Sequence, residues 1–351
     1  MGSKTGWILA LAVILAVVIV LWIVILDPQP SLPRETNADG FLDLKKVAIP
    51  LGDVIGFTPS APGNAAEDYQ KAVNLWISRG KEIDAVADAE RYDALVASED
   101  MYKDPALQAA KQIADHVAAG AKKQKMEYSF VYSPKTLTVG YHHAHSTHLW
   151  KVSVTVHLLH NLHKDRKEYA QAEEQLKHMF VLGWHMLNER RLAQVERDGV
   201  EIITVALQRF QELYGVWREG RPGHRMGPIK EYDSALRLVS DNFRRKKKIL
   251  WDNIPARDPV TNDPALYPGD VFNVVKNDQD RAWRVQGVIA LGPLKHLVTS
   301  RGDIKECRRL IKRSLASKDP IIEAAAKAAD AMDRDAFRSL GSDFSDEETG
   351  Y

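Results

Sequence analysis

Residues 142–217 read HHAHSTHLWKVSVTVHLLHNLHKDRKEYAQAEEQLKHMFVLGWHMLNERRLAQVERDGVEIITVALQRFQELYGVW, and this stretch decides the fold. It combines a long helical periodicity with nine of the chain's twelve histidines. Apolar residues recur every three or four positions, which predicts packed amphipathic helices. Gly183 and Gly199 lie on the apolar stripes, so we expect them to let two helices approach closely. The three expected helices span about 146–164, 168–188 and 190–218.

Further helices are expected on both sides of this stretch. Asn64 has the residue type of an N-cap, Gly80 is expected to end the helix that follows it, and Asp104-Pro105 is a strong helix start. Residues 125–141 are aromatic and β-branched, which favours a short hairpin or an irregular connection. The other expected helices span about 65–80, 84–98, 105–122 and 229–253, followed by short paired helices from residue 280.

The N-terminus contains the most specific signal in the chain. Gly6–Leu26 is a run of 21 residues without a charge, and about 20 such residues in a helix cross the ~30 Å hydrocarbon core of a bilayer. A cleavable signal peptide has a shorter apolar core and a small-residue cleavage site, neither of which is present. A buried helix of a globular domain is the other alternative. The sequence therefore predicts an uncleaved, single-pass membrane anchor.

Charges flanking the anchor favour one orientation. Lys4 precedes it, whereas acidic residues outnumber Arg34 just after it. Positive charge tends to stay on the cytoplasmic side, so we expect the N-terminus inside, in the cytoplasmic (inner) membrane, with the body outside the cytoplasm. Six prolines between residues 27 and 62 exclude a long helix there and predict an extended linker.

Composition narrows the range of functions. With 48 Lys and Arg against 47 Asp and Glu, the net charge gives no reason to expect a nucleic-acid partner. The single cysteine, Cys307, excludes an internal disulfide and a Cys-based zinc site. The basic run 244–248 (RRKKK) points around most of a helix, so we interpret it as a solvated surface rather than a binding stripe.

These patterns predict an all-α protein of stacked helical hairpins, similar in architecture to an α-solenoid, behind the transmembrane helix. The expected parts are the anchor (1–26), the Pro/Gly-rich linker (27–62), a helical body (63–253), an irregular connection (254–279), a C-terminal helical unit (280–341) and an acidic, disordered tail (342–351).

Two segments resemble known helical repeats. The segment EYAQAEEQLKHMFVLGWHML (168–187) resembles a tetratricopeptide-like hairpin. Residues 284–332 resemble a HEAT repeat, in which an Arg near the start of the first helix, an Ala-Leu-Gly near its end and an Asp-Pro before an Ala-rich helix recur. Here these are Arg284, Ala290–Gly292 and Asp319-Pro320. With its anchor, the chain resembles uncharacterised bacterial single-pass helical-repeat proteins, and this resemblance implies protein binding rather than chemistry.

A histidine cluster at the start of the organising stretch is the candidate metal site. Imidazole suits Zn, Cu, Ni or haem iron, and a second set, His157, His160 and His163, repeats at three-residue spacing, which keeps side chains within one arc of a helix. No HExxH motif or fixed fourth ligand accompanies either set, and histidines on an apolar face are more often buried in a core. The candidate ligands are His142, His143, His145 and His148.

No complete catalytic signature is present: GxSxG, a P-loop and GxGxxG are all absent. We therefore expect a non-enzymatic, membrane-anchored protein that binds or scaffolds protein partners in the cell envelope, without a cofactor. A His-based binder of Zn, Cu or haem is the alternative.

Overall fold

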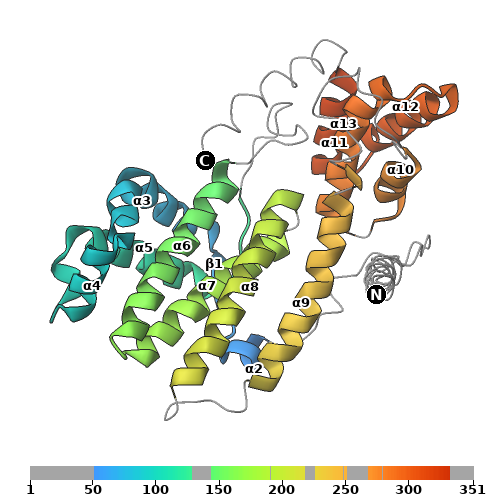
Figure 1. The fold of residues 1–351 in the computed structure, drawn as a ribbon. Helices are drawn as coiled ribbons and strands as arrows, with labels where there is room; N and C mark the ends of the chain where they lie inside the picture. Colours follow the sequence, from blue (N-terminus) through green and yellow to red (C-terminus); the bar gives the residue numbers. More distant parts are fainter. Residues whose placement is uncertain are drawn as a thin grey trace, which may run out of the picture. The chain divides into compact units, whose positions relative to one another are not determined.

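The structure is a computed structural model, and it describes residues 51–128, 144–189, 191–217, 226–247, 249–250, 268–278 and 280–332. Helices dominate this part of the chain (Figure 1), which confirms the all-α prediction. The predicted anchor and acidic tail, and the linker up to residue 50, lie outside the described residues. Among the helices that are described, none combines the length and the apolar character that a membrane span requires.

The first described elements form a small helical layer joined by a short sheet. Asp104 Oδ1 accepts a hydrogen bond from the backbone N–H of Ala106 at 2.8 Å, and Pro105 occupies the first turn, so the predicted helix start is confirmed. Two short strands pair in parallel, with Ala61 opposite Lys123. The elements are α2 (Leu51–Ile55), β1 (Ala61–Asn64), α3 (Ala66–Asp84), η3 (Ala85–Ala87), α4 (Ala89–Ala97), η4 (Met101–Lys103), α5 (Pro105–Ala121) and β2 (Lys123–Lys125).

Gly80 does not end its helix, contrary to the prediction, because α3 continues to Asp84. A Cβ at Gly80 would lie 2.7 Å from the Trp76 ring. This glycine therefore makes room for the indole of Trp76. Asn64 does act near the helix start as predicted, since its Oδ1 accepts from the backbone N–H of Ala66 at 3.1 Å.

The organising stretch forms α6 (Ala144–Asp165), α7 (Tyr169–Glu189) and α8 (Ala193–Val216), close to the predicted bounds. Successive helices lie side by side (Figure 1), with α7 packed on α6 and on α8. At the α7–α8 crossing a Cβ on Gly199 would lie 2.6 Å from the carbonyl oxygen of Gly183. The expected close approach at these two glycines is confirmed.

The remaining elements are α9 (Met226–Lys247), α10 (Pro268–Asn277), α11 (Arg281–Leu297), α12 (Arg301–Leu315) and α13 (Pro320–Ala331). Helix α9 packs against α8 and α2, and the last four helices pack on one another. Asp319 caps α13 by accepting from the N–H of Ile321 at 2.9 Å. The Asp-Pro pair that carries the HEAT resemblance therefore starts a helix.

The basic run at the end of α9 is not uniformly solvated, which corrects the expectation from its sequence. Lys246 is 1% exposed and Asp278 is 2% exposed, and their charged groups lie 2.8 Å apart. The ammonium group also lies 5.5 Å from the centre of the Trp283 ring. Since Asp278 lies between α10 and α11 and Trp283 lies in α11, this ion pair joins α9 to the C-terminal helices.

Candidate functional site

The predicted metal ligands can be followed only in part. His142 and His143 lie outside the described residues, and His145 is described for its backbone alone, in the first turn of α6. His148 is half-buried on α6, where its ring lies 5.9 Å from that of Trp76, with the planes tilted by 38°. The structure therefore brings His148 to α3, and the four-histidine site stays a prediction.

His157 and His160 form a pair about two and a half turns further along α6. Their rings are stacked, with centroids 5.9 Å apart. His160 is fully buried, and its Nδ1 lies 3.0 Å from the carbonyl oxygen of Ala172 on α7. The Nε2 atoms of both rings are buried and have no hydrogen-bond partner among the described residues. Burial lowers the pKa of each imidazole to about 4, so both rings are neutral near pH 7 and act as packing groups between helices.

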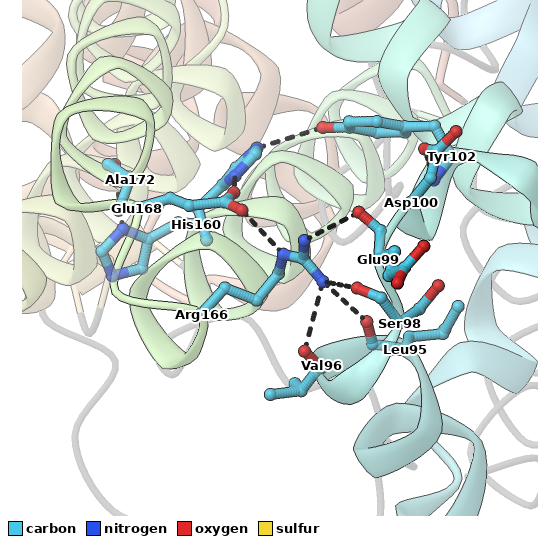
Figure 2. A network of polar contacts seen from close by, with 11 residues as sticks. Leu95, Val96, Ser98, Glu99, Asp100, Tyr102, His160, Arg166, Glu168 and Ala172 are labelled. Carbon is cyan, nitrogen blue, oxygen red and sulfur yellow. Dashed lines mark hydrogen bonds and ion pairs between the residues drawn. The ribbon is translucent and has the colours of Figure 1, made fainter.

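His163 belongs to a row of three polar side chains, and Figure 2 labels the other two, Tyr102 and Glu168. Its Nδ1 lies 2.6 Å from Glu168 Oε2, and its Nε2 lies 3.0 Å from the hydroxyl oxygen of Tyr102. A carboxylate can only accept hydrogen bonds, so Nδ1 donates to Glu168, and Nε2 accepts from the Tyr102 hydroxyl when the imidazole carries a single proton. The order is therefore phenol, imidazole, carboxylate.

Arg166 extends this row to the end of α4. Its Nε donates to Glu168 Oε1 at 2.8 Å, while its Nη1 donates to the backbone carbonyls of Leu95, Val96 and Ser98 (Figure 2). The carbonyls of a helix's last turn have no partner within the helix, and a guanidinium offers five N–H donors in a fixed plane. Arg166 thus caps α4 from the α6–α7 turn.

Tyr102 and Glu168 each keep one protonation state at neutral pH. Burial raises the pKa of Tyr102 to about 12, so the phenol stays protonated at neutral pH. Burial alone would raise the pKa of Glu168, but hydrogen bonds from His163 and Arg166 outweigh it and lower that pKa. A neutral phenol and an ionised carboxylate suit the hydrogen bonds already made. We therefore interpret the row as a clasp between the α6–α7 turn and the α4–η4 segment.

Replacing Arg166 by alanine tests the clasp. The change removes charged hydrogen bonds to Glu168 and to the end of α4, and hydrogen bonds to charged groups contribute about 1.5–3 kcal/mol. We expect the free energy of unfolding in urea to fall by about 2–3 kcal/mol, with faster amide exchange over residues 95–102. Arg209→Ala is the matched control, because its ion pair with Glu212 is more exposed and should contribute less than about 1 kcal/mol. Equal losses in the two variants would contradict the clasp.

A second buried polar group surrounds the end of α7. His185 Nδ1 lies 2.8 Å from the Tyr69 hydroxyl, and its Nε2 lies 2.9 Å from the carbonyl oxygen of Lys123. Glu189, 9% exposed, accepts from the N–H of Tyr128 at 3.0 Å through Oε1, while its Oε2 is buried with no partner in the part of the chain that the structure describes. Burial raises the pKa of Glu189 to about 7. These contacts fix α7 against α3 and β2.

Glu189 gives stability a defined dependence on pH. In the unfolded chain the carboxyl ionises from about pH 4.5 upward, whereas the folded protein holds its proton up to about pH 7, so stability falls between these values. We expect Glu189→Gln to raise the free energy of unfolding by about 2–3 kcal/mol at pH 8 and by less than about 1 kcal/mol at pH 5. Urea unfolding at both pH values measures this. An effect of the same size at both would show that ionisation of Glu189 is not the cause.

Within the described residues, no group of three or more His, Cys, Asp or Glu side chains is arranged to hold a metal ion. Cys307 is buried, and burial raises the pKa of its thiol to about 12, so the thiol stays protonated at neutral pH. No protein-family model, curated protein or solved structure matches the chain. The function must therefore be inferred from the residues of this chain.

The sequence did not single out the partners of these histidines. Tyr102 and His163 are 61 positions apart, and Tyr69 and His185 are 116 apart. A periodic pattern assigns a residue to a helix face, but it does not say which distant residue that face meets. Only the turn pair His163 and Glu168 could have been found, as an imidazole and a carboxylate five positions apart.

Proposed function

We propose that this protein is a non-enzymatic, membrane-anchored scaffold of the cell envelope whose helical body binds another protein. Gly6–Leu26 would tether the chain in the membrane, with the body outside the cytoplasm. The histidines, tyrosines and carboxylates described above join one helix to another, which supports a structural rather than a chemical use of the body.

One exposed surface, formed by α3 and α6, carries this proposal. We call Trp76, Ile77, Lys151 and Val154 the α3–α6 surface. Ile77 is 58% exposed and Val154 is 41% exposed, while Trp76 is half-buried with the Lys151 ammonium 5.7 Å from its ring centre. Single exposed apolar residues are common, but a tryptophan beside a cation and flanked by aliphatic side chains has the composition of an interface anchor.

Site-specific photo-crosslinking tests this proposal. A photoreactive residue at Ile77 of the full chain, in the membranes where it is naturally made, should yield one defined protein adduct. Val154→Asp should abolish that adduct. The matched control position is Leu238 on α9, which is 57% exposed and lies outside the α3–α6 surface. Identical adduct patterns at positions 77 and 238, or no adduct at 77, would contradict a protein-binding role for this surface.

A His-based metal site, for Zn, Cu or haem, is the alternative proposal. It is supported by His148, whose half-buried ring makes no hydrogen bond within the described residues. His148 lies near the start of α6, the helix that His145 also occupies. Titration of Zn²⁺ or Cu²⁺ into the full chain tests it, with a variant carrying alanine at His142, His143, His145 and His148 as control. Equal binding by the two chains would remove this alternative.

A further inference from the structure

Helix α12 carries a line of exposed cations. Successive residues of an α-helix are separated by 100°. Positions 301, 305, 308 and 312 therefore fall within about 60° of one another, along roughly 16 Å of the helix. All four side chains are exposed. We call them the cationic stripe: Arg301, Lys305, Arg308 and Lys312.

The opposite face of α12 is fixed against the protein. Cys307, Leu310 and Ile311 are buried, with exposures of 1% or less, and the helix packs on α10, α11 and α13. The stripe therefore cannot turn inward. Arg309 and Arg313, both exposed, extend the positive charge along one edge of the stripe.

The stripe has no acidic counterpart among the described residues. Its four side chains make no hydrogen bond or ion pair there. Glu306, at the edge of the charged face, pairs instead with Arg309 at 2.7 Å and with Lys276 at 2.6 Å. Exposed ion pairs usually contribute little to stability. The four cations of the stripe nevertheless repel one another, and an external anion would relieve this repulsion.

We infer that the cationic stripe binds the anionic headgroups of a phospholipid bilayer. This inference rests on the proposed membrane anchor, which would keep the body beside a lipid surface. Lys and Arg residues held close to an anionic bilayer surface are attracted to it, each strengthening the contact by about fivefold. A straight line of cations on one helix can meet a planar surface all at once. The exposed arc contains no aromatic side chain on which a nucleic-acid base could stack.

Lysine labelling of the full chain in lipid nanodiscs tests the inference. One set of discs contains phosphatidylcholine alone, and the other contains equal parts of phosphatidylcholine and phosphatidylglycerol. We expect acetylation of Lys305 and Lys312 to be slower by more than about fivefold in the anionic discs. Labelling of the exposed Lys81 and Lys230 should be the same in both. About 0.5 M salt should restore labelling of the stripe, because salt screens exposed charges.

One variant removes two positive charges from the stripe, and a control variant removes two from α9. Comparing them separates lipid binding by the stripe from an effect of net charge. Arg301→Gln/Arg308→Gln leaves the two reporter lysines in place and should remove most of their protection. Arg237→Gln/Arg244→Gln removes two equally exposed arginines from α9, and should leave protection unchanged. Equal loss of protection in the two variants would overturn the inference.

Three results would overturn the inference for different reasons. If the full chain does not enter either kind of disc, the membrane anchor fails, and the inference fails with it. If the chain enters both but Lys305 and Lys312 are labelled equally, the anchor stands and the inference is wrong. If a DNA duplex added to the phosphatidylcholine discs protects these lysines more strongly than phosphatidylglycerol does, the stripe is a nucleic-acid surface instead.

Discussion

Between pH 8 and pH 5 the protein should lose about 5 kcal/mol of stability through the buried histidines His160 and His185 and the half-buried His157. Burial lowers the pKa of each imidazole to about 4, mainly because the charged form would lose its hydration. Each histidine in the unfolded chain has its ordinary pKa near 6.5. This acid sensitivity would be one of the largest energetic effects in the molecule.

The sign follows from proton uptake. As the pH falls below about 6.5, the unfolded chain binds protons at these histidines while the folded protein does not, so the unfolded state is favoured. The loss continues until the pH approaches 4, where the folded protein also takes up protons. At pH 5 the lowered pKa of each histidine reduces the free energy of unfolding by about 2 kcal/mol, and the half-buried His157 contributes less than the other two. Glu189 opposes this trend, so Glu189→Gln makes the histidine effect easier to measure.

The double variant His157→Leu/His160→Leu tests the pair on α6. It replaces two rings whose Nε2 atoms are buried and have no partner within the described ranges, so we expect a change of less than about 1 kcal/mol at pH 8. At pH 5 the variant should be more stable than the original chain by about 3 kcal/mol. Urea unfolding of the full chain in nonionic detergent, followed by circular dichroism, measures both. Leu159→Val on the same helix is the control, since it should cost about 1 kcal/mol at either pH.

The second large effect concerns the crossing of α7 and α8. A Cβ on Gly183 would lie 2.8 Å from the carbonyl oxygen of Gly199, and a Cβ on Gly199 would lie 2.6 Å from that of Gly183 and 2.8 Å from the amide nitrogen of Leu187. These neighbours are backbone atoms, so a side-chain rotation cannot relieve the contact. Alanine at either position must force the helices apart.

We expect Gly183→Ala and Gly199→Ala each to lower the free energy of unfolding by about 3 kcal/mol, at the upper end of the range for overpacked cores. The better helix propensity of alanine, about 1 kcal/mol, offsets only part of this. The double variant should cost little more than one single variant, because the first change already separates the helices. Urea unfolding of the three variants gives these values.

Gly215 supplies a matched control on α8 itself. A Cβ there would meet no atom within 4 Å, so Gly215→Ala should stabilise the protein slightly, by up to about 1 kcal/mol. If Gly199→Ala behaved like Gly215→Ala, the close crossing would be wrong. Strictly additive losses at 183 and 199 would argue against a single shared contact.

Helical periodicity carried much of the fold prediction. The three helices between residues 144 and 216, the start at Asp104-Pro105 and the close approach at Gly183 and Gly199 all follow from patterns a few residues long. The parallel pairing of β1 and β2 could not be predicted, because its strands are short and about sixty positions apart. The prediction that Gly80 ends its helix is wrong, because a glycine that ends a helix and a glycine that accommodates an indole can have the same local sequence.

The candidate sites show the same division between local and distant information. The spacing of His157, His160 and His163 correctly places them on one helix, yet their surroundings depend on α7, α8 and η4. The dense basic run predicts a solvated surface, but Lys246 within it is buried. The cations of α12 are spaced along the helix and form no dense run, so charge density does not reveal them. Spacing along a helix decides whether charges gather on one face, and composition alone does not show it.

The ion pair of Lys246 and Asp278 restricts where the chain can be divided. A fragment ending in the connection after α9 would retain Lys246 but lose Asp278 and the ring of Trp283. An ammonium group left alone in an apolar environment destabilises a protein by about 3–5 kcal/mol. Such a fragment would be a poor substitute for the whole body in binding studies, and the same argument holds for the C-terminal helices expressed without α9. The irregular connection therefore does not divide the chain into two independent folding units.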